Sequence, residues 1–362
     1  MKLGFFTMPL HPVGRDWRQT LEEDREAVLL AEKLGFEEAF IGEHVTDLAE
    51  TITSCLIFIA TLARDTKRIK LGSGTVNLAN RHPAATAAEI AMVDTLLEGR
   101  FILGVGPGGL PSDAEMFQTM DEDRNAIFLE SMEHMLALWT EDPPYRREGK
   151  RWRLTTERTF APDIGMGAML KPFQNPHPPI VVTAMLPNSN GIAAAAARGW
   201  TPISANFVHP WVIRTHWPKY AEGCARVKRD ARRADWRVAK SIFVGEDDAT
   251  VRRVTRAPGN VFGDYFHNLQ RKAQRTRGNA FFKHEPSVPD SAVTEEYLTD
   301  QLLIAGTVNE VVDKLLAFRE HIGPFGTLLY CGHDWSDAPA MRRSMELMAE
   351  KVMPAVKRAI GE

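Results

Sequence analysis

The sequence predicts an α/β protein folded as a (β/α)8 TIM barrel, with insertions in the loops that follow its strands. Two observations support this fold class. Short apolar segments alternate with longer amphipathic segments along the whole chain, which is the pattern of a parallel sheet covered by helices. Eight segments have strand character, and a closed barrel accommodates that number better than an open doubly wound sheet.

The predicted strands are, in chain order, Leu3 to Phe6, Ala39 to Gly42, Ile69 to Gly72, Phe101 to Val105, Ile180 to Thr183, Trp200 to Ser204, Lys240 to Val244 and Thr327 to Cys331. Residues 101–105 are nearly all apolar, which is typical of a parallel strand buried on both faces. Between the strands, apolar residues recur at spacings of three and four, as in 17–34 and 85–97, and this predicts amphipathic helices.

Two segments are too long for simple strand-to-helix connections and are predicted to be insertions within a single domain that spans residues 1–362. The first, at about 142–178, is rich in proline and contains a candidate hairpin around Glu148 and Gly149. The second, at about 247–299, would cover the ligand-binding end of a barrel as a lid, or else form a mobile surface loop.

Composition points to a globular cytoplasmic protein with a small-molecule partner. The chain is 44% hydrophobic and 25% charged, and its formal net charge of -3 creates no field that would attract nucleic acid or an anionic membrane. Its longest apolar run, near Cys55, is about half of the roughly 20 residues that a membrane-spanning helix needs. The three cysteines are far apart, and the N-terminus carries no export signal.

A dense group of glycines follows the strand at 101–105. Gly104, Gly106, Gly108 and Gly109 lie within six residues, which favours a loop where the backbone approaches a ligand, although turn geometry alone would explain one or two of them. The group is a poor match to the dinucleotide-binding fingerprint, because Pro107 interrupts it and no acidic residue ends a strand about 20 residues later.

His44 is the best candidate for a catalytic residue. It directly follows the strand Ala39 to Gly42, and catalytic groups of barrel enzymes lie at the carboxyl ends of the strands. A lone histidine is also commonly structural. The other histidines show no spacing typical of metal ligands, so no metal site is predicted.

A polar helix start follows the fifth predicted strand, at Asn188, Ser189 and Asn190. Unpaired amides and the helix dipole make such a position suitable for a phosphate group. Simple capping of the helix by Ser189 is the alternative explanation.

In this order, these features resemble the bacterial luciferase-like flavin-dependent monooxygenases, and the resemblance covers essentially the whole chain. The subgroup that looks most similar contains the limonene and diketocamphane monooxygenases. The resemblance is carried by Leu3-Gly4-Phe5-Phe6, Ala31-Glu32-Lys33-Leu34-Gly35-Phe36, Ile41-Gly42-Glu43-His44, Arg81-His82-Pro83, Glu98-Gly99-Arg100-Phe101 and Gly306-Thr307-Val308-Asn309-Glu310-Val311.

The resemblance implies a two-component oxidoreductase that receives reduced FMN (FMNH2) from a separate NAD(P)H:flavin reductase. The flavin would react with O2 to a C4a-peroxide and insert one oxygen atom into a small hydrophobic substrate of the terpenoid or cyclic ketone type. Hydroxylation, epoxidation and Baeyer-Villiger insertion all stay open. The superfamily also contains F420-dependent hydride-transferring enzymes and non-catalytic flavin-binding subunits, which are the two alternatives. Members usually pair through helices, so a homodimer is expected.

The resemblance also assigns site residues. His44 would act beside the flavin ring, and Ser189 with Asn188 and Asn190 would hold the FMN phosphate. Other cofactor-binding positions are Gly74 and Thr75, which match a non-proline cis peptide beneath the flavin, Gly106 and Pro107 in the glycine turn, and Asn206 facing the ring system. Phe6 and Met8 would line the substrate pocket.

The chain departs from luciferase itself at two places. Pro107 replaces a basic residue that helps to bind phosphate, and Met185-Leu186 replace an acidic-hydroxyl pair. These departures argue against light emission from a long-chain aldehyde.

Overall fold

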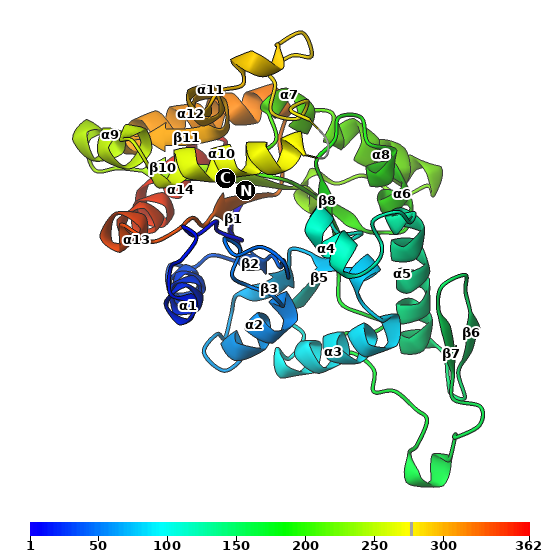
Figure 1. The fold of residues 1–362 in the computed structure, drawn as a ribbon. Coiled ribbons are helices and arrows are strands. Elements are labelled where there is room, and N and C mark those ends of the chain that lie inside the picture. The colour runs from blue at the N-terminus through cyan, green and yellow to red at the C-terminus, as the bar shows by residue number, and fades with distance from the viewer. Residues whose placement is uncertain (276–277) are drawn as a thin grey trace. The chain divides into compact units, whose positions relative to one another are not determined.

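The computed structural model describes residues 1–275 and 278–362 (Figure 1). The strands are β1 (Lys2–Thr7), β2 (Glu38–Ile41), β3 (Lys70–Ser73), β4 (Val76–Asn77), β5 (Phe101–Gly106), β6 (Arg146–Glu148), β7 (Arg153–Thr155), β8 (Ile180–Ala184), β9 (Thr201–Ser204), β10 (Arg237–Val244), β11 (Leu303–Gly306) and β12 (Thr327–Cys331).

The main helices are α1 (Trp17–Lys33), α2 (Cys55–Leu62), α3 (Pro83–Leu96), α4 (Pro111–Met116), α5 (Arg124–Thr140), α6 (Asn190–Ala197), α7 (Pro210–Ile213), α8 (His216–Arg226), α9 (Asp248–Arg256), α10 (Val261–Gln274), α11 (Glu295–Leu302), α12 (Val308–Ile322), α13 (Ala338–Leu347) and α14 (Met353–Ala359). Short helical turns are η1 (Leu78–Asn80), η2 (Pro162–Ile164), η3 (Arg233–Asp235), η4 (Asp290–Ala292) and η5 (Met348–Val352).

The strand order confirms the predicted fold class. The main sheet runs β11-β10-β12-β1-β2-β3-β5-β8-β9, and β10 also pairs with β9, so within the described residues the sheet closes on itself. Each predicted strand coincides with a member of this ring. The short strands β4 and β11 were not predicted; β4 pairs with β5, and β11 pairs with the end of β10.

The chain divides into two compact units. The first contains residues 1–40, 48–51 and 182–362. In it β1 lies parallel to β12, with Lys2 opposite Thr327, and β10 pairs with both β12 and β9. Phe5 on β1 is fully buried and stacks against Tyr330 of β12, and both rings contact Phe36. Residues of neighbouring strands thus form part of this unit's apolar core.

The second unit contains residues 41–47 and 52–181. Here β3 lies parallel to β5, with Leu71 opposite Phe101. A Cβ atom on Gly104 would lie 1.8 Å from the backbone oxygen of Ser73. The Ser73 hydroxyl also bonds to both the N–H and the carbonyl oxygen of Gly104. Gly104 is therefore required by the contact of two strands, whatever the ligand.

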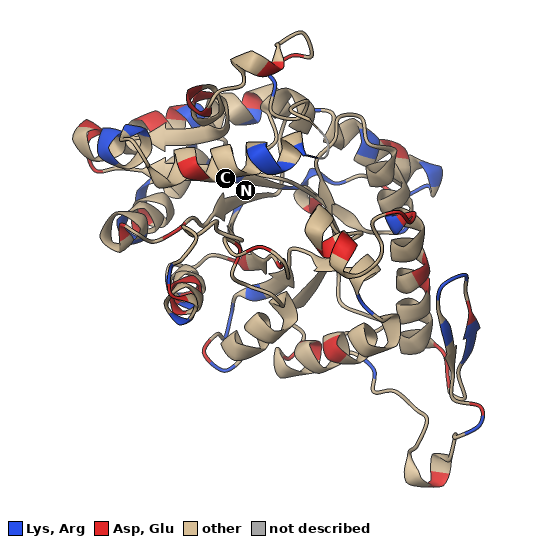
Figure 2. Cartoon of the chain, in the orientation of Figure 1, with Lys and Arg blue, Asp and Glu red and all other residues tan. Residues whose placement is uncertain are grey.

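The first insertion contains the predicted hairpin. Strands β6 and β7 pair antiparallel, with Glu148 opposite Arg153, so the turn lies where the sequence predicted it. Its arginines make the hairpin basic (Figure 2). At the other end of the insertion, Gln174 bonds through its backbone and side chain to Asp94 of α3.

The second insertion forms α9, α10, η4 and α11 in the first unit. Tyr265 and Phe266 of α10 belong to a buried cluster that also contains Leu10, from the loop after β1, and Ala49. Lys272 pairs with Glu50 at 2.6 Å. In the part of the chain described, no helix combines the length and the apolar character that crossing a bilayer requires.

Candidate active site

His44 lies in the loop after β2 and is held by a carboxylate from α4. Its Nδ1 atom is 3.0 Å from Oδ2 of Asp113, and its side chain is 14% exposed. Pro111 begins α4 and places Asp113 in the first turn. The other oxygen of Asp113 accepts hydrogen bonds from the Thr46 backbone at 2.8 Å and the Thr46 hydroxyl at 2.6 Å. The loop that carries His44 is thereby fixed to α4.

The electrostatics of this pair decide which nitrogen of His44 carries the proton that faces Asp113. Burial alone would raise the pKa of Asp113, but hydrogen bonds from His44 and Thr46 outweigh burial and hold the pKa below its ordinary value. An ionised carboxylate only accepts hydrogen bonds, so Nδ1 of His44 carries the proton that it donates to Asp113. The Nε2 atom is the ring nitrogen that does not face Asp113, and an imidazole can accept or deliver a proton near neutral pH.

Glu43, next to His44, ties together the segments around it. This carboxylate is buried and accepts hydrogen bonds from the backbone N–H groups of Cys55 at 3.0 Å and Asn77 at 3.1 Å. Arg81 lies 3.8 Å away. One side chain therefore links the loop after β2 to the start of α2 and to β4.

The second unit also brings Gly74, Thr75 and Gly106 close to the His44 loop. The Gly74–Thr75 peptide bond is cis, as the resemblance predicted, and the Gly74 N–H donates to the carbonyl oxygen of Ile41 at 2.6 Å. A Cβ atom on Gly106 would lie 3.0 Å from the Thr75 hydroxyl. Pro107 follows and is half-buried. These positions therefore form one local group beside the end of β2.

In the first unit, Ser189 stands at the N-cap of α6, but its side chain forms no capping hydrogen bond there among the described residues. The Ser189 hydroxyl therefore does not form the hydrogen bond that simple capping of the helix would require. The Asn188 N–H already donates to the Thr215 hydroxyl at 2.9 Å. A cation that the sequence analysis missed, Lys219 of α8, lies 3.0 Å from Oδ1 of Asn190.

Asn206 follows β9 and is 2% exposed. Its side-chain nitrogen donates to the hydroxyl oxygens of Ser241 at 3.1 Å and Tyr265 at 2.9 Å. Phe6 and Met8, at the end of β1 and just after it, are half-buried. Phe6 faces away from the buried Phe5, because successive strand residues point to opposite faces.

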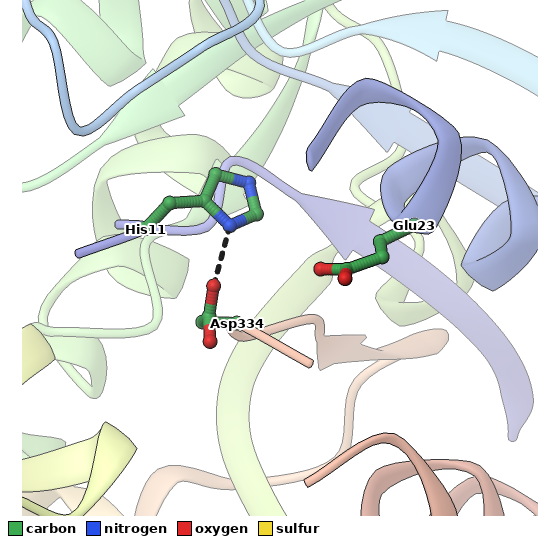
Figure 3. A group of neighbouring side chains, drawn as sticks. All are labelled: His11, Glu23 and Asp334. Carbon is green, nitrogen blue, oxygen red and sulfur yellow. Dashed lines mark hydrogen bonds and ion pairs between the residues drawn. The ribbon is translucent and has the colours of Figure 1, made fainter. Parts of the chain in front are cut away.

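One group in the first unit has atoms close enough to hold a metal ion: His11, Glu23 and Asp334 (Figure 3). Protein cations already occupy this group. The Arg15 guanidinium donates to Asp334 at 2.6 Å and to Glu23 at 2.6 Å. His11 lies between Asp334, 2.7 Å from its Nδ1, and Asp24, 3.3 Å from its Nε2.

Burial would lower the pKa of His11, but hydrogen bonds to the two aspartates raise it to about 9, so the ring is protonated near neutral pH. Two cations thus neutralise the carboxylates of this group. We conclude that it is an internal ion-pair network that joins the loops after β1 and β12.

Two functional candidates escaped the sequence analysis for different reasons. Asp113 ends the glycine-rich stretch, where an acidic residue in a first helical turn is ordinary because of the helix dipole. Only the tertiary structure shows that it contacts His44. Lys219 sits in a helix of mixed charge, and its distance of 29 residues from Asn190 hides their contact.

Comparisons with known proteins show which family the chain resembles along its length. The family model described as luciferase-like monooxygenase matches residues 1–323. The chain is 30% identical over 361 residues to 4-hydroxyprotoasukamycin monooxygenase of Streptomyces nodosus subsp. asukaensis, covering 98% of this chain and 92% of the relative. It is 27% identical to 3,6-diketocamphane 1,6-monooxygenase of Pseudomonas putida, with 98% of each chain covered.

A solved structure, the oxygenating constituent of 3,6-diketocamphane monooxygenase from Pseudomonas putida in complex with FMN, superposes with a TM-score of 0.88. Sequence identity to it is 26%, and 98% of each chain is covered. The family model covers well over half of the chain, and the solved structure shares its fold over nearly the whole length. This chain therefore belongs to the luciferase-like monooxygenase family.

Proposed function

We propose that this protein is the oxygenase of a two-component FMN-dependent monooxygenase, built as a single domain, which inserts one oxygen atom from O2 into a small hydrophobic substrate. The observation that carries the proposal is the His44–Asp113 pair at the carboxyl end of β2. Barrel enzymes keep their catalytic groups at this end of the strands. The similar protein from Pseudomonas putida is described as an oxygenating constituent in complex with FMN, which supports the cofactor and a separate NAD(P)H:flavin reductase.

In each unit taken by itself, the described residues offer groups suited to a part of FMN. The Ser189 hydroxyl and the first amides of α6 are suited to a phosphate group, and Lys219 supplies a positive charge beside Asn190. Gly106 and Gly109 remove side chains near the end of β5, where Gly109 has no atom within 4 Å of an added Cβ. The buried Asn206 follows β9 and was predicted to face the ring system.

Reduced FMN, when bound, supplies the activation of O2. The chain's own residues would control protons and water. His44, oriented by Asp113, would hold or deliver a proton through Nε2. Phe6 and Met8 would present apolar surface to the substrate, and α10, as the proposed lid, would exclude water. We propose a substrate of the terpenoid or cyclic ketone type.

The deciding experiment is anaerobic titration of the full chain with reduced FMN, reduced riboflavin and reduced F420, followed by a pulse of O2. We expect reduced FMN to bind most tightly, since riboflavin lacks the phosphate group that α6 is proposed to hold and F420 carries its phosphate as a diester with a longer tail. Flavin reoxidation should also be slower than in free solution. Preference for F420 without any reaction with O2 would instead support hydride transfer, and flavin binding without turnover by any reductase would indicate a non-catalytic subunit.

We also propose that the protein is a cytoplasmic homodimer that pairs through α2 and α3. Helix α2 carries no charged side chain (Figure 2), and Ile57 on it is 71% exposed. Met92 and Leu96 on the packed neighbour α3 are also exposed. Light scattering of Ile57→Glu should report a monomer where the wild type is a dimer. A wild-type monomer at micromolar concentration would refute the pairing.

The three cysteines are buried and free, which suits the proposed reducing compartment.

A further inference from the structure

A buried polar cluster lies at the carboxyl ends of β9 and β12 in the first unit, level with Ser241 in the middle of β10. It consists of Asn206, Ser241, Tyr265 and His333, all at most 5% exposed. Asn206 follows β9, Ser241 is on β10, Tyr265 is on α10 and His333 follows β12. The cluster therefore joins the proposed lid helix to the end of the barrel where ligands bind.

The direction of each hydrogen bond can be worked out from the donor groups. The Asn206 amide nitrogen only donates, so the hydroxyl oxygens of Ser241 and Tyr265 both accept from it. His333 Nε2 lies 3.0 Å from the Ser241 hydroxyl. Ser241 has no other acceptor among the described residues, so its own hydrogen goes to Nε2. A neutral His333 then carries its proton on Nδ1.

Two hydrogen-bond donors of the cluster have no acceptor among the described residues. His333 Nδ1 is buried and has no hydrogen-bond partner. In the described ranges, the only hydrogen bond of the Tyr265 hydroxyl is the one it accepts from Asn206. The two rings are edge to face, with centroids 4.5 Å apart. Burial lowers the pKa of His333 to about 3 and raises that of Tyr265, so both groups are neutral donors at physiological pH.

Buried donors without an acceptor are rare in native proteins and costly. We propose that Tyr265 and His333 together bind the carbonyl oxygen of a ligand. A carbonyl oxygen has two lone pairs and no hydrogen, which matches two neutral donors. Phe262, whose ring centroid is 4.7 Å from that of His333, makes the surroundings apolar and disfavours a carboxylate.

This inference rests on the proposed function, which supplies two sources for such an oxygen: a ketone substrate, or a carbonyl group of the flavin ring. Both sources offer the same group, a carbonyl oxygen that accepts two hydrogen bonds. A hydrocarbon substrate without oxygen would leave both donors unpaired. If the ketone is the source, the site selects carbonyl compounds by the cost of leaving its own polar groups unsatisfied.

The test compares Tyr265→Phe with a matched control, Tyr297→Phe. Tyr297 is on α11, and its hydroxyl bonds to His284 in the wild type. Dissociation constants of the full-length protein are measured by calorimetry for FMN, for the bicyclic ketone camphor and for its parent hydrocarbon bornane. Tyr265→Phe should weaken either camphor or FMN about ten-fold, since one hydrogen bond is lost. It should leave bornane unchanged, and the control should change none of the three.

Weakening of camphor alone identifies a ketone as the source, and weakening of FMN alone identifies the flavin. Unchanged affinity for both, no binding of either, or equal weakening of camphor and bornane overturns the proposal. A wild type that binds camphor but no flavin refutes the proposed function without refuting this site. If Tyr265→Phe does not fold, the Nδ1–H resonance of His333 in histidine-labelled wild type decides instead, because a bound carbonyl must shift it.

Discussion

Oδ2 of Asp113 lies 3.0 Å from Nδ1 of His44, so the first turn of α4 fixes the ring that follows β2. The same carboxylate holds the Thr46 backbone and hydroxyl. Asp113 thus has two roles that an experiment can separate. It determines the shape of the loop, and it determines which nitrogen of His44 carries the proton.

Asp113→Asn is expected to lower product formation about 100-fold, because an amide can donate to Nδ1 and favours the other tautomer of His44. Hydrogen peroxide released per flavin oxidised should rise, and the affinity for reduced FMN should stay within about two-fold. Rapid mixing of flavin-loaded protein with O2 and substrate measures these quantities. Asp163→Asn, at an exposed position in the first insertion, is the control. Equal losses of flavin affinity and of turnover would show that Asp113 acts only on loop structure.

The strands of the barrel could be predicted because each is a short apolar run between amphipathic segments, and burial on both faces leaves a direct mark on composition. His44 could be predicted as a candidate for a similar reason, since its place after a strand is visible in the chain. The contacts of Asp113 with His44, and of Lys219 with Asn190, depend on segments that are far apart in sequence. No local pattern marks such pairs.

The glycine turn shows the same limit at the level of one residue type. Four neighbouring glycines suggested a ligand-approach loop, but they differ in cause. Gly104 accommodates the Ser73 backbone, Gly108 has a φ of +84°, and Gly109 has open space around an added Cβ. Composition alone cannot tell which glycine serves a contact between strands, which serves a turn and which leaves space for a ligand.

Gly104→Ala should abolish soluble folded protein, because the new methyl group would overlap the Ser73 carbonyl oxygen and neither backbone can move without breaking the sheet. Gly109→Ala should change the midpoint of chemical denaturation by less than the equivalent of about 0.5 kcal/mol. Expression level and denaturation curves measure both effects. A folded Gly104→Ala variant with wild-type stability would contradict the packing described for β3 and β5.

The His11 network predicts a loss of stability at alkaline pH. The pKa of His11 is raised to about 9 in the folded protein against an ordinary value of 6.5, so its stabilising effect is complete below about pH 6.5 and disappears as pH rises through 9. His11→Gln should therefore be less stable at pH 6, by at most about 3 kcal/mol. The difference between the two proteins should shrink towards pH 10. Denaturation midpoints at intervals between pH 6 and pH 10 provide the measurement, and a constant difference would refute the raised pKa.

Lys240 on β10 should be a site where stability can be gained. Its side chain is fully buried, its Nζ has no hydrogen-bond partner in the described part of the chain, and the Phe318 ring lies 5.5 Å away. Burial lowers its pKa to about 8. Lys240→Met removes the buried charge and keeps a side chain of similar length, so the free energy of unfolding at pH 7 should rise by about 1–3 kcal/mol.

The pH dependence of Lys240 has the opposite sign to that of His11. A lysine whose pKa is lowered on folding destabilises the protein fully below that pKa, and the penalty fades as pH rises from 8 towards 10.5. The gain from Lys240→Met should thus diminish over that interval. Lys33→Met, at an exposed position on α1, should give neither the gain nor the trend. A destabilised Lys240→Met would mean that the ammonium group has a favourable partner.

Lys219 offers a test of phosphate recognition that does not depend on turnover. Its ammonium group lies 3.0 Å from Oδ1 of Asn190 and 2.9 Å from Glu222, so its charge is held beside the N-terminus of α6. Lys219→Met should weaken FMN about ten-fold and leave riboflavin unchanged, because riboflavin lacks the phosphate group. The exposed Lys351→Met is the control for loss of a positive charge. The FMN affinity of the wild type should also fall as salt concentration rises, and more steeply than that of Lys219→Met, since the lost contact is the one that salt screens. Equal weakening of FMN and riboflavin would mean that Lys219 stabilises the fold of α8 and does not bind the phosphate. Unchanged FMN affinity would mean that the phosphate does not bind at α6.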